Sequence, residues 1–334
     1  MNLLIVGEAF GEREAEAGKP FVGPSGSVLN SLLRQSGIDR DEISITNVFN
    51  FRPEGNDIET LLTTIQADAA EGWPTFAPKK WFHKQHSLSL YDLTELRKAL
   101  RPHVIIALGD TALWALTHHR GMNKYRGTPM LTFDGLHKVI ATWHPAAILR
   151  QWDLRPVAFM DFQKAKRQAA FPELRRPERH IMIEPSLDDI ANFYYDHIRP
   201  APFLSVDIET KEGQITEIGF ATSASRAIVI PFWDRKAIGG NYWPSAADEK
   251  RAWIWVRRIL EEKPVIGQNF QYDMTYLYKT MGIKTRHFKG DTMLLHHAMQ
   301  PELKKSLGFL GSIYSDEPAW KFMREGIETL KKED

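Results

Sequence analysis

The sequence predicts an α/β protein of two domains. The chain has 334 residues, and at roughly 150 residues per domain this length favours about two domains. Short apolar runs end at glycine or polar residues, which is typical of buried strands. Helical periodicity separates many of these runs. Strands that alternate with helices form parallel sheets with helices on both faces.

The composition excludes several classes of protein. Lys and Arg number 43 against 42 Asp and Glu, so the net charge is +1. This balance excludes a polybasic DNA-coating protein but allows a local basic cleft. The chain has no cysteine, which excludes disulfides, thiolate zinc sites and cysteine nucleophiles. No apolar run approaches the ~18 residues of a membrane span, and the N-terminus lacks a secretory signal. We therefore expect a cytoplasmic protein with no membrane partner.

The first half of the chain alternates strand and helix patterns. A loop rich in glycine and proline, between Gly7 and Gly26, follows the first apolar run. A charged, proline-rich segment at 172–180 marks a domain boundary, so we expect a first domain over 1–172 and a linker over 173–180. The expected strands are 2–6, 43–48, 103–108 and 139–143, and the expected helices are 27–36, 93–100 and 111–116.

The second half begins a new α/β pattern, which we expect to form a domain over 181–334. Ser186 is placed to cap a helix, and two alternating runs read as a meander. A charged, helix-like stretch occupies 327–334. The expected strands are 181–183, 203–206, 215–221, 226–231 and 265–267, and the expected helices are 187–197, 253–260 and 272–281.

Polar side chains follow the expected strands of the first domain, where ligands sit in open α/β sheets. Glu8, Asn47 and His144 each occupy such a position, and Phe21 lies in the glycine-rich loop. An aromatic ring can stack on a base, an amide can read an imide edge such as that of uracil, and an imidazole can stabilise an oxyanion. With a carboxylate to position water, the set suits cleavage of the N-glycosidic bond of a flipped base. Taken singly, each residue is more often a turn, cap or structural residue.

These residues lie in motifs that resemble those of family 4 uracil-DNA glycosylases. GEAFGEREAEAGKPFVGPSG resembles the first motif and ITNVFNFRPEGN the second, and RPHVIIALGDTALWAL, YRGTP and ATWHPAAILR follow in order. The resemblance implies that Phe21 stacks on uracil, Asn47 reads it and His144 stabilises the departing uracilate. It implies catalytic roles for Glu8, Glu14 and His144, uracil binding by Ala9, Phe21, Asn47 and Asn56, and a DNA-facing loop that carries Pro145 and Arg150. Lys19, Arg52 and Arg126 are further candidates for phosphate contacts.

Two departures from the family pattern stand out. The family usually carries a four-cysteine iron–sulfur cluster, whereas this chain has Phe51 where one cysteine would stand. We therefore expect no cluster and no cofactor in this domain, with Phe51, Trp73 and Trp81 filling the space. Phe10 replaces the usual proline between the glycines, which could reshape the uracil wall.

A second set of carboxylates follows the strand at 203–206. Asp207 and Glu209 are two residues apart, so they point to the same face of a strand. Asp273 lies one turn into a helix that follows another strand. Neighbouring carboxylates are costly unless a cation holds them, and oxygen ligands suit Mg²⁺ or Mn²⁺. A pair of such ions could clamp a scissile phosphate and activate water.

This half resembles the proofreading 3′–5′ exonuclease domain of family A DNA polymerases. PFLSVDIETKEGQITEIGFA resembles the first exonuclease motif, VIGQNFQYDMTYL the second, and KGDTMLLHHAMQPELKKSLGFL the helical segment that follows. The resemblance implies a ribonuclease H-like (DnaQ-type) fold. The family's third motif, Tyr-x-x-x-Asp, is not found, because Tyr314 and Asp316 have the wrong interval. We expect a domain that is incomplete at its C-terminus, with weak or no nuclease activity.

Both halves point to DNA as the partner, single- or double-stranded and containing uracil. The main hypothesis is a uracil-DNA glycosylase joined to an exonuclease-like domain, and a pairing of this kind suits phage-like replication in a host cytoplasm. A DNA polymerase, or a missing C-terminal region, is a further expected partner. Two alternatives stay open: a non-catalytic DNA-binding scaffold of a replication complex, and the front part of a polymerase in which only the exonuclease half works.

Overall fold

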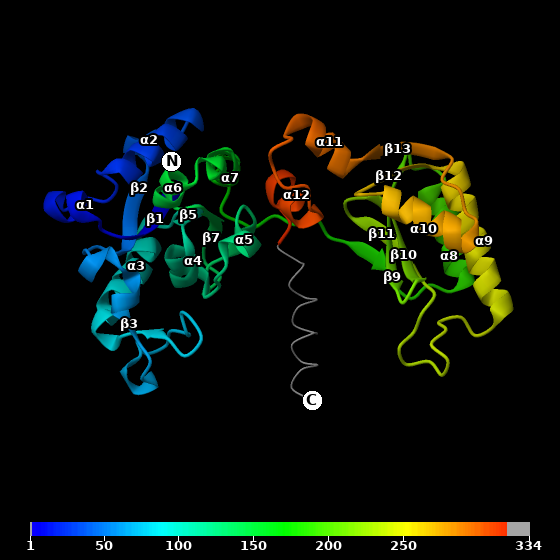
Figure 1. Ribbon diagram of the computed structural model, residues 1–334, viewed down its shortest axis with the longest axis horizontal. Helices are drawn as coiled ribbons and strands as arrows, with labels where there is room; N and C mark the ends of the chain where they lie inside the picture. The colour runs from blue at the N-terminus through cyan, green and yellow to red at the C-terminus, as the bar shows by residue number, and fades with distance from the viewer. Residues whose placement is uncertain (1, 319–334) are drawn as a thin grey trace. The chain divides into compact units, whose positions relative to one another are not determined.

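The computed structural model describes residues 2–318 of the chain. The chain divides into two compact units (Figure 1). The first unit comprises residues 1–175 and takes up the chain again from Gly308, and the second comprises 176–307. The charged stretch at 327–334 lies outside the described residues. Within the described part, no helix has the length and apolar character that crossing a membrane requires.

The first unit is built on a five-stranded sheet with the order β2-β1-β5-β7-β6. Its strands are parallel except for the edge strand β6, which pairs antiparallel with β7. The apolar runs expected to be buried strands are buried, which confirms the α/β prediction. The strands are β1 (Leu3–Ala9), β2 (Ser44–Phe49), β5 (Val104–Leu108), β6 (Pro129–Leu131) and β7 (Lys138–Thr142).

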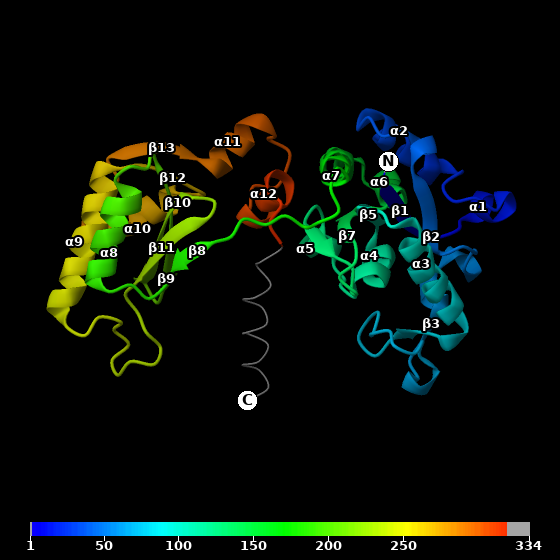
Figure 2. The same cartoon turned by 180° about the vertical axis from the view of Figure 1, so that it is seen from behind.

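Helices cover both faces of this sheet (Figure 2). Apolar side chains of α2, α6 and α7 form one core cluster, and those of α3 and α4 form the other. A small hairpin of β3 (Leu62–Thr63) and β4 (Trp81–Phe82) precedes α3. The helices are α1 (Glu12–Ala17), α2 (Pro24–Gln35), α3 (Ser87–Leu100), α4 (Asp110–Thr117), α5 (Met122–Tyr125), α6 (Pro145–Arg150), α7 (Arg155–Gln168) and α12 (Leu307–Tyr314).

Aromatic side chains pack where the resemblance would place a cluster cysteine. The Phe51 ring lies 5.7 Å from that of Phe49 and stacks 5.6 Å from that of His86. Trp73 lies 5.3 Å from the buried Trp114. Phe51 and Trp73 pack against the core, whereas Trp81 is not part of that core cluster. Because the sequence supplies no thiolate, a four-cysteine cluster does not fit this region.

The order of the strands places a ligand site at the carboxyl ends of the strands. β1 lies between β2 and β5, so the chain runs outward from β1 in one direction and continues from β5 to β7 in the other. Ligands bind at such switch points, beyond the carboxyl ends of the strands. The residues that lie at these carboxyl ends include Glu8, Asn47, Gly109 and His144.

The second unit contains a six-stranded mixed sheet with the order β13-β12-β9-β10-β11-β8. β10 and β11 form the expected meander, to which β9 adds antiparallel, and β12 runs parallel to β9. The strands are β8 (His180–Met182), β9 (Leu204–Lys211), β10 (Gln214–Ser223), β11 (Arg226–Pro231), β12 (Pro264–Gly267) and β13 (His287–Asp291), and the helices are α8 (Leu187–Phe193), α9 (Ala246–Glu262), α10 (Gln271–Met281) and α11 (Thr292–Met299).

Candidate active site

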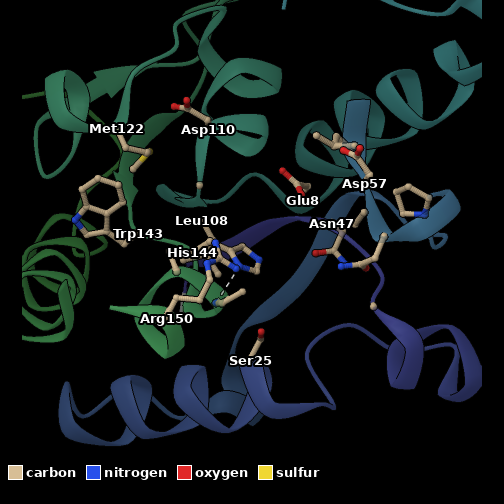
Figure 3. A pocket seen from close by; sticks show the side chains of 18 of the residues that line it. Glu8, Ser25, Asn47, Asp57, Leu108, Asp110, Met122, Trp143, His144 and Arg150 are labelled. Carbon is tan, nitrogen blue, oxygen red and sulfur yellow. Dashed lines mark hydrogen bonds between the residues drawn. The ribbon is translucent and has the colours of Figure 1, made fainter. Parts of the chain in front are cut away.

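A cavity of about 730 Å³ opens at the carboxyl ends of β1, β2, β5 and β7 (Figure 3). Side chains from all four strand ends line it, together with the loop before α2 and the segment that contains α5. The structure therefore brings together residues that are far apart in the sequence. The expected residues that line the cavity are Glu8, Ala9, Glu14, Phe21, Asn47, Asn56, His144 and Arg150.

Phe21 and Asn47 meet over Gly7. A Cβ atom on Gly7 would lie 2.3 Å from Asn47 Oδ1 and 2.5 Å from Phe21 Cζ, so only glycine fits here. Phe21 itself has a φ of 56°, a left-handed conformation that is costly for a bulky residue. Strain of this kind is found at binding sites. Its ring centre lies 5.7 Å from that of His144.

The amide oxygen of Asn47 is poised for a ligand. Asn47 is 3% exposed, and its Oδ1 has no hydrogen-bond partner within the described structure. An acceptor that is buried without a partner costs roughly 1–3 kcal/mol. A donor on a bound molecule, such as an imide N–H, would satisfy it.

Glu14 fixes the loop that carries Phe21. Its Oε1 accepts hydrogen bonds from the backbone N–H groups of Val22, at 3.0 Å, and of Gly23, at 2.8 Å. Gly23 is the N-cap of α2, so the carboxylate also lies at a helix N-terminus, which favours negative charge. One oxygen of Glu14 is thus committed to the loop, while the residue still lines the cavity.

Glu8 is held by a residue that the sequence reasoning missed. The Thr111 hydroxyl, in the first turn of α4, donates a hydrogen bond to Glu8 Oε2. Thr111 is 1% exposed, so this hydroxyl serves the interior of the site. In the sequence, Thr111 could have been identified as a site residue because it lies two positions after Gly109, at the end of an expected strand.

His144 has a defined protonation state. Its Nδ1 accepts a hydrogen bond from the backbone N–H of Ala146 at 3.1 Å, as the N-cap of α6. Burial, aided by the positive charge of Arg150, lowers the pKa of His144 to about 4. The ring is therefore neutral near pH 7, and its proton is assigned to Nε2.

The far wall of the cavity comes from a segment with no sequence signal. Met122, Asn123 and Lys124 line it from α5. Asp110 Oδ1 holds this segment by accepting a hydrogen bond from Gly121 N–H at 2.9 Å. Short irregular loops carry no periodicity, which is why the sequence did not predict this wall.

Two of the residues that were expected to face DNA, Arg126 and Pro145, are buried. Arg126 is 5% exposed and pairs with Asp161 at 2.6 Å, so it is buried and does not reach a phosphate. Pro145 is also buried and begins α6 instead of facing the cavity. Arg150 is exposed and lines the cavity. Lys19 is exposed, and Arg52 pairs with Glu12.

In the second unit the predicted carboxylates lie on β9 and α10. Asp207 and Glu209 are on β9, and Asp273 is 4% exposed on α10. Asp273 Oδ1 accepts a hydrogen bond from Ile208 N–H at 2.9 Å. Burial, together with the negative charges of Asp207 and Asp291 and against the opposing effect of that hydrogen bond, raises the pKa of Asp273 to about 6.

These carboxylates do not form a closed metal site. Between residues 2 and 318, no group of three or more His, Cys, Asp or Glu side chains is arranged to hold a metal ion. Asp291 is engaged elsewhere, because its oxygens accept hydrogen bonds from Asn269, Phe270 and Met293 N–H. Oxygen donors suit Mg²⁺, but their grouping here does not fit a bound pair of ions.

Comparison with solved structures returns crystal structures of the EXD2 exonuclease domain. The form soaked in Mn and GMP is 15% identical, with a TM-score of 0.27, and the match covers 41% of this chain and 70% of that one. The form soaked in Mg and dGMP is 14% identical, with a TM-score of 0.27, over 42% of this chain and 72% of that one.

Sequence comparison identifies the first unit. The model of the family described as the uracil DNA glycosylase superfamily matches residues 1–175. The type-4 uracil-DNA glycosylase of Thermotoga maritima is 36% identical over 169 residues, which are 49% of this chain and 76% of that protein. The enzyme of the same name from Archaeoglobus fulgidus is 30% identical over 170 residues, 49% of this chain and 74% of that protein. The chain belongs to the uracil DNA glycosylase superfamily.

Proposed function

We propose that the first unit removes uracil from DNA by hydrolysing the N-glycosidic bond of a nucleotide flipped into the cavity. The observation that carries this proposal is the convergence of Phe21, Asn47 and His144 on one cavity, with the Asn47 amide oxygen buried and unpartnered. The relatives from Thermotoga maritima and Archaeoglobus fulgidus are type-4 uracil-DNA glycosylases.

Base recognition follows from the three side chains. The Phe21 ring offers a platform for a planar base, and its strained backbone is held by the loop that Glu14 anchors. Asn47 Oδ1 would accept the N3–H of uracil. Cytosine has no hydrogen on N3, so it would leave this oxygen unpaired. The backbone at Ala9 and the side chain of Asn56 complete the walls.

Bond cleavage needs charge stabilisation on the base and a positioned water. As the bond to the sugar breaks, negative charge develops on the uracil oxygens, and the neutral His144 can donate from Nε2 to one of them. Glu8, oriented by Thr111, is the carboxylate placed to hold a water and accept its proton. Glu14 has one oxygen committed to backbone N–H groups, so we assign it to positioning of the loop.

The DNA strand would follow the rim of the cavity. Arg150 and Lys124 are exposed and line the cavity, so they can contact phosphates of the strand that carries the flipped nucleotide. These are contacts to the backbone of DNA, so they add affinity without sequence specificity.

An excision assay tests the proposal. The full chain is incubated with an oligonucleotide that contains one uracil, with and without EDTA, and abasic sites are cleaved by alkali. We expect a metal-independent abasic product that Glu8→Gln and His144→Ala each reduce by at least about 100-fold. Glu16→Gln, an exposed glutamate on α1, is the matched control. Binding of the oligonucleotide without excision would identify the chain as a DNA-binding scaffold instead.

For the second unit we propose a DNA-binding, exonuclease-like role with weak or no cleavage. Asp207, Glu209 and Asp273 are carboxylates of the kind that hold Mg²⁺ or Mn²⁺, yet they do not form a closed group. In this proposal a polymerase partner supplies a further carboxylate. The same assay reads this out: Mg²⁺-dependent shortening of the oligonucleotide that Asp207→Ala abolishes would show that this unit is a working nuclease. A cytoplasmic location remains a prediction.

A further inference from the structure

A buried polar network joins α12 to the wall of the cavity. Arg126 directly follows α5, and its guanidinium bonds to Asp161 on α7 at 2.6 Å and to the Ser312 hydroxyl on α12. The other Asp161 oxygen accepts a hydrogen bond from Thr142 Oγ1 at 2.7 Å. Thr142 is the last residue of β7, two positions before His144.

The Lys164 side chain binds backbone carbonyl groups of the same helix, α12. Its ammonium group is buried, and it donates to the carbonyl oxygens of Ser312 at 2.5 Å, Ser315 at 2.6 Å and Gly127 at 2.8 Å. These three carbonyls use all three donors of the lysine. Two of them lie at the end of α12, where the positive charge also suits the helix dipole.

The fit between α12 and the turn after α5 leaves no spare room. Gly127 has a φ of 71°, and a Cβ there would lie 2.6 Å from Asp161 Oδ1 and 2.8 Å from Ser312 O. Leu310 and Ile313 of α12 are buried, and the Arg126 guanidinium lies 5.2 Å from the Phe309 ring centre. Gln168 Nε2 reaches Asp316 Oδ2 at 2.8 Å. Figures 1 and 2 show α12 beside α5 and α7.

We propose that the first unit carries a docking surface for residues 308–316, formed by Arg126, Gly127, Asp161, Lys164 and Gln168, and that docking orders the α5 wall and the His144 end of β7. The chain leaves the first unit at Arg175 and supplies this segment only after the whole second unit. The segment therefore links the second unit covalently to the part of the first that faces the ligand.

Arg126 and Gly127 connect this network to two elements of the cavity, α5 and β7. The Arg126 N–H closes α5 by donating to Met122 O at 3.0 Å, and Met122 lines the cavity. The Gly127 N–H donates to Ala141 O of β7 at 2.9 Å. Removal of α12 would take the Ser312 hydroxyl from Arg126 and the Ser312 and Ser315 carbonyls from Lys164. Buried charges that lose hydrogen-bond partners are costly, so both connections would be destabilised.

A cleavage experiment on the folded full chain tests the docking. Protease sites are inserted directly after Pro177 and after Glu302, two exposed residues where insertions are tolerated. After both cuts, we expect the C-terminal fragment to co-elute with residues 1–177 on size exclusion. Lys164→Met should raise the dissociation constant of the fragment at least about tenfold, because hydrogen bonds to a charged group are lost. Lys166→Met, an exposed lysine of the same helix, should have no effect.

Hydrogen exchange of the uncut chain tests the effect on the cavity. We expect Lys164→Met, and the milder Ser312→Ala if the first variant does not fold, to speed exchange in 121–128 and 142–146. The proposal is overturned if the wild-type fragment elutes alone after both cuts. It is also overturned if Lys164→Met releases the fragment from the cut chain but leaves exchange in both stretches of the uncut chain unchanged. Neither readout depends on uracil excision, so a failure here is distinct from a failure of the proposed function.

Discussion

Gly7 sets the geometry of the base-binding corner, because Phe21 and Asn47 occupy the space where a side chain would be. Gly7→Ala would place its Cβ within 2.5 Å of both residues, so they must move. We expect uracil excision to fall by about 100-fold, the loss typical of a misplacement near 1 Å. Single-turnover kinetics measures it. Gly219→Ala, where a Cβ would lie 3.8 Å from its nearest neighbour, should retain wild-type activity. Equal activity in the two variants would contradict this geometry.

Thr111 orients Glu8 without touching the base. In Thr111→Val the side-chain volume is kept but the donated hydrogen bond is lost. We expect kcat to fall roughly tenfold, as for one hydrogen bond to a charged group, with little change in KM. Thr111→Ser should restore the rate. If the valine and serine variants behave alike, Thr111 has only a packing role.

The His144 imidazole should stay neutral at pH values well below the ordinary pKa of a histidine. NMR of the ¹⁵N-labelled imidazole should show the Nε2–H form from pH 8 to 5, with titration near the lowered pKa of about 4. The unfolded chain binds this proton near pH 6.5. The contribution of His144 to stability is therefore complete above pH 6.5 and declines as the pH falls toward 4, by up to ~1.4 kcal/mol per pH unit. Titration near pH 6.5 in the folded protein would contradict the assignment.

The loop between α1 and α2 depends on one carboxylate. In Glu14→Gln a neutral oxygen replaces the charged acceptor of the Val22 and Gly23 N–H groups. We expect these two amides to exchange faster, a loss of about 1 kcal/mol in unfolding free energy, and a higher KM. Hydrogen exchange and urea denaturation measure the change, with Glu16→Gln as control. Unchanged exchange would show that the loop is held by other contacts.

Elements with apolar patterns were predictable, and those with buried polar faces were not. The strands β1 and β5 are continuous apolar runs, so their sequences suffice. The helix α7 escaped prediction because its buried face includes Asp161, Lys164 and Gln168. These residues are polar by sequence and become interior only through partners elsewhere in the fold. The start of α9 was missed for another reason, because its charged first turns carry no apolar periodicity.

Some residues of the candidate site could likewise be predicted from the sequence, and others could not. Glu8, Asn47 and His144 follow strands, so topology alone predicts that they converge. The α5 wall and the hydroxyl of Thr111 come from segments whose positions depend on tertiary contacts. The resemblance to family 4 glycosylases supplied Asn56 and Arg150, which no periodicity marks.

In the molecule taken whole, the sequence placed a linker at 173–180 and a second domain from 181 onward. The structure instead returns to the first unit from Gly308. No change of composition marks that point, because α12 is simply an apolar helix. Its partners, Arg126 and Lys164, read as surface cations until the buried network is seen.

Single-turnover excision from an oligonucleotide that carries either uracil or cytosine at one position, with EDTA present, tests the base-binding cavity most directly. We expect release of uracil but not of cytosine, and a fall of at least about 100-fold for uracil in Asn47→Ala. Asn192→Ala, an exposed asparagine on α8 that does not line the cavity, should keep excision within a few-fold of wild type. A folded wild-type chain that releases no uracil, or an Asn47→Ala variant that excises it at the wild-type rate, would contradict the account.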